Sequence, residues 1–267
     1  MPIITLLTDF GIEDEYVGVM KGAILSIHPQ AIIVDLSHQV SPHRVLEAAY
    51  ILEASYRYFP EGTIHTIVVD PGVGTDRKII VLRKDGHVFI APDNGVLSMI
   101  LDAGGIEFVV AVENDDFFLK PVSETFHGRD IFAPVAAHLS KGLVPSRLGA
   151  EIIPDQLARV EIVRPYISEK KEIIGGIVAI DHFGNLITDI HRGMLTEFKK
   201  SLHDSRVLVQ VSGQSITGLS KGYEANDYGR SLALIGSRGY LEIAVCRGSA
   251  REVFHAQIGD RVRVTIN

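Results

Sequence analysis

Four short apolar runs, each ending in an aspartate, constrain the fold of this chain more than any other feature of its sequence. They are rich in isoleucine and valine and span residues 3–9, 31–35, 66–70 and 176–181. Runs that are apolar at nearly every position are typical of strands buried on both faces, as in parallel sheets. We therefore expect a sheet whose strands lie inside the protein.

Helical patterns separate the first three of these runs. Tyr16 to His28 and Val45 to Tyr58 both place apolar residues three and four positions apart. The resulting βαβαβ order predicts a doubly wound, Rossmann-like α/β layer. Ligands of such sheets bind beyond the carboxyl ends of the strands, where Asp9 and Asp70 are expected to lie.

The two halves of the chain differ in pattern. In the N-terminal half we also predict strands at 78–83, 87–91 and 108–112 and helices at 96–102 and 131–140. In the C-terminal half we predict one helix at 193–200 and short strands at 176–180, 206–211, 232–235, 240–245 and 261–266. Short strands at regular spacing are typical of a small β-barrel or sandwich. We therefore expect an α/β domain over 1–163, a linker over 164–171 and a β-barrel domain over 172–267.

Composition argues against several classes of protein. Of the 267 residues 46% are hydrophobic and 22% charged, and the net charge is −7, so we expect neither a disordered chain nor a nucleic-acid partner. No apolar run is long enough to cross a bilayer, and no basic leader precedes Asp9, so we expect no membrane partner. The single cysteine, Cys246, allows no internal disulfide, which fits a reducing compartment. We expect a soluble, cytoplasmic protein.

The stretch VVDPGVGTDR, residues 68–77, places Asp70 at a strand end and Arg77 after a turn rich in glycine. Proline presets such a turn and glycine tolerates positive φ, so the carboxylate and the guanidinium can meet. The pair is either an ion pair that closes a loop or part of a catalytic group. A phosphate-binding loop fits poorly, because its full spacing and its Lys-Ser/Thr ending are missing.

Two further motifs stand near predicted strand ends. In FHGRD, residues 126–130, His127 precedes a predicted helix together with an arginine and an aspartate. A lone loop histidine is usually structural, but this grouping favours a functional one. Asp9 in TDFG suits a ribose, because a carboxylate accepts two hydroxyl hydrogen bonds at once. A metal site built from Asp9, Asp70, His127 and Asp130 lacks compact ligand spacing, so we expect no metal.

Polar loops also occur after other predicted strands. The two histidines of SHQVSPH, residues 37–43, are interpreted as loop hydrogen-bonding groups rather than ligands. In the C-terminal half, Asp181 and Asn185 of DHFGN can bind an ammonium group and an adenine edge, or they can be simple turn residues. Ser237 and Arg238 of GSRGY can bind a carboxylate through a backbone N–H and a guanidinium.

Taken together and in this order, TDFG, VVDPGVGT with its following arginine, TFHGRD, DHFGN and GSRGY resemble the motifs of the S-adenosylmethionine hydroxide adenosyltransferase family. The resemblance covers nearly the whole chain. It implies an N-terminal α/β domain, a C-terminal β-barrel, and a homotrimer with the ligand between neighbouring subunits. It also implies a reaction in which S-adenosyl-L-methionine and water give adenosine and L-methionine, with no cofactor.

The resemblance further implies a catalytic group. The hydrolysing branch of the family carries an Asp-Arg-His triad, and the matching positions are Asp70, Arg77 and His127. Halogenating relatives carry an aromatic residue in place of Asp70 and a Tyr-Ser pair in place of His127-Gly128. A halide needs a dry, uncharged pocket, and a carboxylate beside it would repel it. Asp70 therefore favours hydrolysis over a chlorinase-like reaction; a binding protein without turnover is the other alternative.

The substrate-binding residues are likewise implied by the resemblance. Asp9 is expected to hold the ribose and Asn185 the adenine. Asp181 and Ser237 are expected to hold the amine and the carboxylate of the methionine part. The other expected binding residues are Tyr223, Arg238, Glu242, Val245 and Arg247. Of these, Tyr223 has the loosest match.

Overall fold

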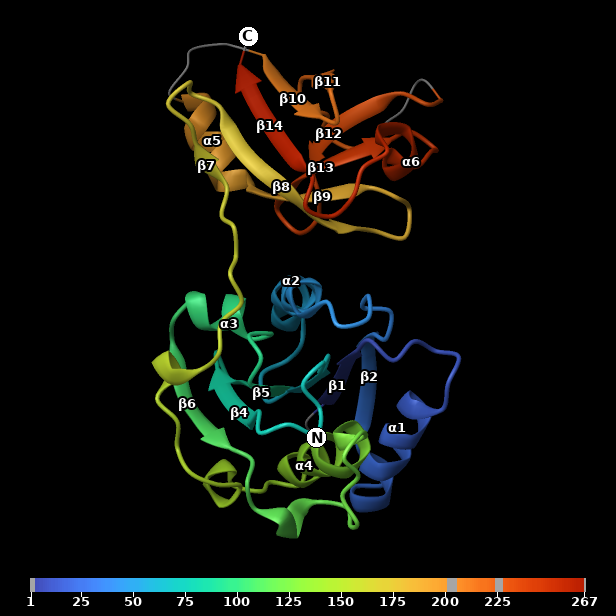
Figure 1. The fold of residues 1–267 in the computed structure, drawn as a ribbon, viewed down its shortest axis with the longest axis vertical. Helices are drawn as coiled ribbons and strands as arrows, with labels where there is room; N and C mark the ends of the chain where they lie inside the picture. The colour runs from blue at the N-terminus through green and yellow to red at the C-terminus, as the bar shows by residue number, and fades with distance from the viewer. Residues whose placement is uncertain (1–2, 201–205, 224–227, 267) are drawn as a thin grey trace. The chain divides into compact units, whose positions relative to one another are not determined.

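The computed structural model describes residues 3–200, 206–223 and 228–266. The chain divides into two compact units, Met1–Glu161 and Ile162–Asn267 (Figure 1). The segment 164–171, expected as a linker, contains the short strand β7 (Tyr166–Ile167), which pairs with β8 (Ile173–Ile180). This pairing joins the segment to the sheet of the second unit.

The first unit is built on a six-stranded sheet with the order β2-β1-β3-β5-β4-β6. The parallel strands are β1 (Ile3–Thr8), β2 (Ile32–Ser37), β3 (Ile64–Val68) and β5 (His87–Pro92). Two strands add antiparallel pairs, β4 (Ile79–Lys84) beside β5, and β6 (Ile106–Ala111) beside β4. Because β3 ends at Val68, Asp70 lies beyond the strand rather than at its last position.

Helices cover both faces of this sheet, as the doubly wound prediction requires (Figure 1). One face packs against α1 (Tyr16–Ile27) and α4 (Ala133–Ser140), the other against α2 (Val45–Ser55) and α3 (Ser98–Asp102). The helix predicted over 131–140 instead begins with a π-helical turn, Gly128–Phe132, followed by α4. Short 3₁₀ turns occupy Tyr56–Tyr58, Asp115–Phe117, Pro145–Arg147 and Pro154–Gln156.

The second unit is a nearly closed antiparallel sheet with the order β11-β10-β14-β8-β9-β13-β12, so the predicted barrel-like architecture is confirmed. Its remaining strands are β9 (Leu186–His191), β10 (Val207–Val211), β11 (Gln214–Thr217), β12 (Ser231–Ile235), β13 (Tyr240–Val245) and β14 (Arg261–Ile266). Its helices are α5 (Arg192–Lys200) and α6 (Ala250–Phe254). A bridge between Ser220 and Leu234 connects the chain after β11 to β12. Apolar side chains from all these strands fill the interior.

None of the helices within the described residues has both the length and the apolar character needed to cross a membrane.

A buried pair of histidines lies in the core of the first unit. His65 is fully buried in β3, with Nδ1 2.8 Å from Thr5 Oγ1 and Nε2 3.2 Å from Nδ1 of His87. The ring of Phe89 stacks on that of His65. Burial, and then the neighbouring His87, lowers the pKa of His65 from 6.5 to about 3. The folded core therefore holds this imidazole in its neutral form.

We expect the first unit to lose stability on acidification because His65 must remain neutral in the fold. Its folded pKa is below its unfolded pKa, so its contribution is complete above 6.5 and is lost as the pH falls toward about 3. Between neutral pH and pH ~4.5 the loss is on the order of 3 kcal/mol. This loss of stability is measured by urea unfolding of the wild type and of His65→Gln at both pH values. The variant is expected to lose less stability on acidification, and an equal loss in both proteins would contradict the assignment.

Candidate functional site

The loop after β3 brings its acid and its arginine together through two overlapping turns. The carbonyl of Asp70 accepts from Val73 N, and the carbonyl of Gly72 accepts from Thr75 N, both at 3.2 Å. Gly74 has φ +79°, and a Cβ there would lie 2.5 Å from the carbonyl oxygen of Glu124. Glycine therefore allows this loop to pack against the loop that leads to His127.

Asp70, Arg77 and His127 form one hydrogen-bonded chain. Arg77 Nε donates to both carboxylate oxygens of Asp70 at 2.9 Å, and Arg77 Nη2 donates to Asp70 Oδ2. The same Nη2 lies 2.8 Å from Nδ1 of His127. The Asp70 side chain is 4% exposed and that of Arg77 is 10% exposed. The predicted triad is thus assembled in the first unit, with the arginine between the acid and the imidazole.

This arrangement determines the hydrogen positions on His127. A guanidinium has no acceptor, so Nδ1 must accept from Arg77, and the hydrogen of the neutral ring lies on Nε2. Burial, followed by the positive charge of Arg77, lowers the pKa of His127, although Asp70, Asp130 and a hydrogen bond with the Ser123 backbone act in the opposite direction. His127 is therefore neutral at physiological pH.

The loop carrying His127 is held by Asp130. This side chain is buried and accepts from Arg129 Nε at 2.6 Å and from the backbone N–H of Ser123 at 2.8 Å. Burial raises the pKa of Asp130, but these hydrogen bonds outweigh it, and the net pKa lies below its ordinary value. The π-helical turn begins directly after His127, and such turns are frequent at functional sites. Asp130 thus stabilises the loop as a charged, fully bonded group.

A cavity of about 300 Å³ joins Asp9, Asp70 and His127. Arg77 binds both polar groups of the chain without lining the cavity. An aromatic wall faces these polar groups: the rings of Phe10, Tyr16 and Phe126 contact one another with centroid separations of 5.0 to 5.9 Å. The cavity therefore combines a carboxylate pair with apolar surface.

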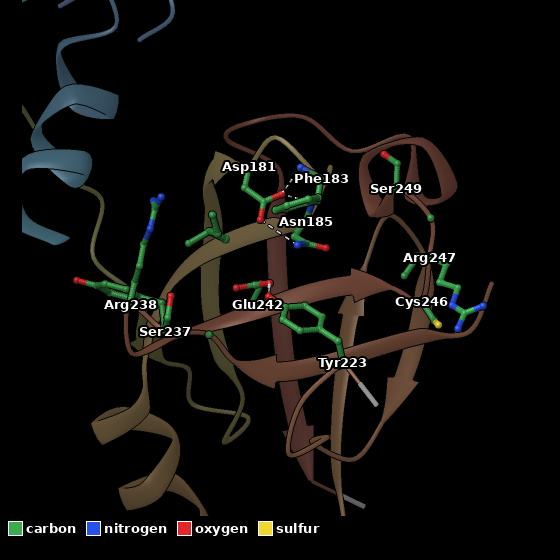
Figure 2. Close-up of a pocket in the computed structure, with 15 residues that line it drawn as sticks. Asp181, Phe183, Asn185, Tyr223, Ser237, Arg238, Glu242, Cys246, Arg247 and Ser249 are labelled. Carbon is green, nitrogen blue, oxygen red and sulfur yellow. Dashed lines mark hydrogen bonds between the residues drawn. The ribbon is translucent and has the colours of Figure 1, made fainter. Parts of the chain in front are cut away.

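The second unit carries a larger pocket of about 930 Å³ (Figure 2). Every binding residue predicted for this unit lines it: Asp181, Asn185, Tyr223, Ser237, Arg238, Glu242, Val245 and Arg247. In Figure 2 the loop of Asp181 lies at one rim, Ser237 and Arg238 at another, and Glu242 and Tyr223 near the centre. Figure 2 also labels three lining residues that sequence reasoning missed, Phe183, Cys246 and Ser249. Phe183 could have been predicted, because it belongs to the DHFGN motif.

Asp181 acts both as a turn residue and as a lining residue. Its Oδ1 accepts from the backbone N–H groups of Phe183 and Asn185, and its Oδ2 accepts from the side-chain amide of Asn185, all at 2.9 Å. Gly184 has φ +81°, and a Cβ there would collide with Ser249. The interpretation as turn residues is therefore confirmed, and both residues also line the pocket; their binding of an ammonium group and an adenine edge stays a prediction.

Glu242 is a buried carboxyl group near the centre of the larger pocket. The Tyr223 hydroxyl donates to its Oε1. Burial raises the pKa of Glu242, and Asp181 adds to this, while the hydrogen bond from Tyr223 and the charge of Arg238 lower it; the net pKa is raised. Burial and Glu242 also raise the pKa of the Tyr223 hydroxyl. The expected role of Tyr223 in substrate binding stays a prediction.

Among the described residues, no three His, Cys, Asp or Glu side chains gather closely enough to hold a metal ion.

Comparison with known proteins gives matches over both units. The model of the SAM hydroxide adenosyltransferase N-terminal domain matches residues 4–149, and that of the C-terminal domain matches residues 175–263. An (R)-S-adenosyl-L-methionine hydrolase from Thermus thermophilus is 36% identical, covering 97% of each chain. One from Salinispora tropica is 35% identical, covering 99% of this chain and 98% of the other. Relatives named fluorinase are more distant, at 27 to 28% identity.

A solved structure supports the same grouping. The crystal structure of an uncharacterized conserved protein from Thermotoga maritima matches with a TM-score of 0.91 at 37% identity. The match covers 98% of this chain and 99% of that one.

Proposed function

Because the chain belongs to the S-adenosylmethionine hydroxide adenosyltransferase family, we propose that it is an enzyme that hydrolyses S-adenosyl-L-methionine to adenosine and L-methionine. The observation that carries this proposal is the hydrogen-bonded chain of Asp70, Arg77 and His127 at a cavity shared with Asp9. Relatives named hydrolase are 33 to 36% identical to this chain, more than those named fluorinase. This difference supports hydrolysis.

The proposed step is a displacement at C5′ of the nucleoside. A water oxygen forms a bond to C5′ while the bond from C5′ to sulfur breaks, and sulfur leaves with the electron pair as the neutral thioether of methionine. The water proton passes to a base. A sulfonium is already a good leaving group, so the main task is to hold the water in line with the breaking bond. Such positioning is worth roughly 7–11 kcal/mol.

We assign the base to Asp70. Nδ1 of His127 accepts from Arg77, and Nε2 carries the hydrogen of the neutral ring, so neither ring nitrogen is free to take a proton. Asp70 is held by Arg77 and lines the cavity. The guanidinium donates to both carboxylate oxygens and so fixes the direction of the carboxylate. His127 then orients the arginine.

The binding residues of the proposal follow the family resemblance. Asp9 is assigned to the ribose and Asn185 to the adenine, with Asp181 and Ser237 at the methionine part. Tyr223, Arg238, Glu242, Val245 and Arg247 complete the set and share the pocket of about 930 Å³, a size typical of small-molecule sites. No cofactor is needed for this chemistry.

We further propose a homotrimer with the ligand between neighbouring subunits, working in the cytoplasm without a nucleic-acid or membrane partner. A monomer has a mass of 29.2 kDa. Light scattering of the purified protein is expected to give three times this mass, and an active monomer would contradict the assembly.

Hydrolysis in ¹⁸O-labelled water tests the reaction directly. Mass spectrometry is expected to find the label in the 5′-hydroxyl of adenosine and none in methionine, because the nucleophile attacks C5′. Unlabelled adenosine, or label in the amino acid product, would contradict the mechanism.

A chlorinase-like reaction is the second candidate, because relatives named fluorinase share this fold family. The carboxylate of Asp70 at the cavity disfavours it by repelling a halide. Adding chloride to the same assay separates the two candidates. Formation of 5′-chloro-5′-deoxyadenosine in place of adenosine would favour the second.

A further inference from the structure

A second group of polar contacts, which joins Asp35, His38 and Thr8, lies next to Asp9. Nδ1 of His38 is 2.9 Å from Thr8 Oγ1, and its Nε2 is 3.0 Å from Asp35 Oδ1. Lys21 Nζ donates to Asp35 Oδ2 at 2.7 Å. None of the steps proposed above uses these groups, although His38 and Thr8 are both buried.

The donors in this group have a defined direction. The carboxylate of Asp35 can only accept, and it faces Nε2 of His38 at 3.0 Å. Thr8 Oγ1 accepts from the backbone N–H of Phe10 at 3.3 Å and donates its own hydrogen to His38 Nδ1. The hydrogen of the imidazole then lies on Nε2 and faces Asp35. Burial raises the pKa of Asp35, but the hydrogen bonds from Lys21 and His38 outweigh it and the net pKa is lowered. The group therefore ends in a charged carboxylate.

An acid, an imidazole and a hydroxyl in this order can activate a nucleophile. Here the Thr8 side chain is fully buried, with 0% exposure, and it does not line the cavity. The hydroxyl thus cannot attack a substrate. It has a structural consequence instead, since it links the ring of His38 to the backbone N–H of Phe10.

This link affects Asp9, which lies in the sequence between Thr8 and Phe10, the two residues that the Thr8 hydroxyl joins. The carbonyl of His38 also accepts from the backbone N–H of Gly11 at 2.7 Å. Asp9 Oδ2 accepts from the backbone N–H of His43 at 2.9 Å, and His43 adopts a left-handed φ of +66°. The loop after β1 is therefore connected to the loop after β2 on both sides of Asp9, and Asp9 and His43 both line the cavity.

We propose that His38 is a positioning residue that holds the Asp9 carboxylate in the direction needed to bind the ribose hydroxyls of the nucleoside. The inference rests on the proposed function for the role of Asp9. It adds His38, with Thr8 and Asp35, as the groups that make this carboxylate selective.

Binding of two nucleosides tests the inference without turnover. Calorimetry compares adenosine with 2′,3′-dideoxyadenosine, which lacks both ribose hydroxyls. His38→Ala is expected to weaken adenosine binding by about tenfold and dideoxyadenosine binding by less than about twofold, because a misdirected carboxylate affects the ribose hydroxyl contacts alone. Asp9→Asn is expected to show the same selective loss.

Two further variants separate positioning from general damage. His38→Asn places an acceptor near the position of Nδ1 for the Thr8 hydroxyl, so it is expected to restore most of the adenosine affinity. Thr8→Val removes the hydroxyl at nearly constant volume and is expected to show the same selective loss of adenosine binding. It replaces His38→Ala in the test if that variant does not fold. The matched control is His28→Ala, because His28 Nδ1 also contacts a hydroxyl, that of Ser140, at 2.7 Å. This control is expected to bind both nucleosides like the wild type.

The outcomes are distinguishable. If the wild type prefers adenosine and the foldable His38 and Thr8 variants keep that full preference, the positioning role of His38 is overturned while the proposed function stands. A parallel loss for both nucleosides also overturns it, since the damage is then not specific to the ribose. If the wild type itself binds the two nucleosides equally, the assignment of Asp9 to the ribose fails, and the inference fails with it.

Discussion

Replacing Asp70 with asparagine is expected to lower kcat for S-adenosyl-L-methionine hydrolysis by about 10²–10⁴-fold, the usual contribution of a positioned base. The amide keeps the shape of the side chain but cannot take the proton of the attacking water. Substrate affinity is expected to change by only a few-fold, because the ligand pocket of the second unit is untouched. Single-turnover rates and calorimetric titration measure the two quantities separately.

Asp76→Asn is the matched control for this prediction. Asp76 lies in the same loop, is exposed, and does not line the cavity. It is expected to keep wild-type kcat. Hydrolysis at the wild-type rate by Asp70→Asn would refute the assignment of Asp70 as the base, whereas equal losses of rate and affinity would make it a binding residue.

Replacing Arg77 with methionine is expected to destabilise the first unit by about 3–5 kcal/mol, since removal of one partner leaves a buried charge unpaired. Asp70 is only 4% exposed and receives three hydrogen bonds from this guanidinium. Urea unfolding measures the loss. The double variant Asp70→Asn with Arg77→Met is expected to recover part of it, because the uncompensated carboxylate is gone.

Arg83→Met provides the comparison at the surface. Arg83 pairs with Glu107 at 3.0 Å, but the two side chains are 48% and 43% exposed. Loss of this ion pair is expected to lower the free energy of unfolding by less than about 1 kcal/mol, as for other exposed pairs. If Arg77→Met lowers the stability no more than Arg83→Met does, the pair with Asp70 does not behave as a buried ion pair, and its proposed role in holding the Asp70 carboxylate in place loses its basis.

Strands were predicted correctly where their own residue types indicate that they are buried. β1 and β3 are buried at nearly every position because helices cover both faces of the sheet. β9 and β11 were missed because polar residues interrupt them, including Asp189 and Gln214. Their extended form depends on pairing with neighbouring strands, which a local pattern does not contain.

The site residues also differ in how far local sequence predicts their contacts. Asp70 and Arg77 are seven residues apart, so a glycine-rich turn suffices to predict that they meet. His127 is fifty residues from Arg77, and the motif alone does not reveal that Nδ1 would face the guanidinium. The interpretation of His38 as a simple loop hydrogen-bonding group was also incomplete, because its contact with Thr8 forms only when β1 and β2 pair.

By itself the sequence determined the α/β and β-barrel architecture and the residue types at each strand end, because periodicity and turn chemistry act over a few neighbouring positions. Only the tertiary structure decided which nitrogen of His127 carries its hydrogen, how deeply Asp70 is buried, and which groups direct Asp9. These properties depend on distances and solvent exclusion between segments far apart in the chain. Packing, rather than local pattern, therefore brings the acids and histidines of this sequence together in a hydrogen-bonded site.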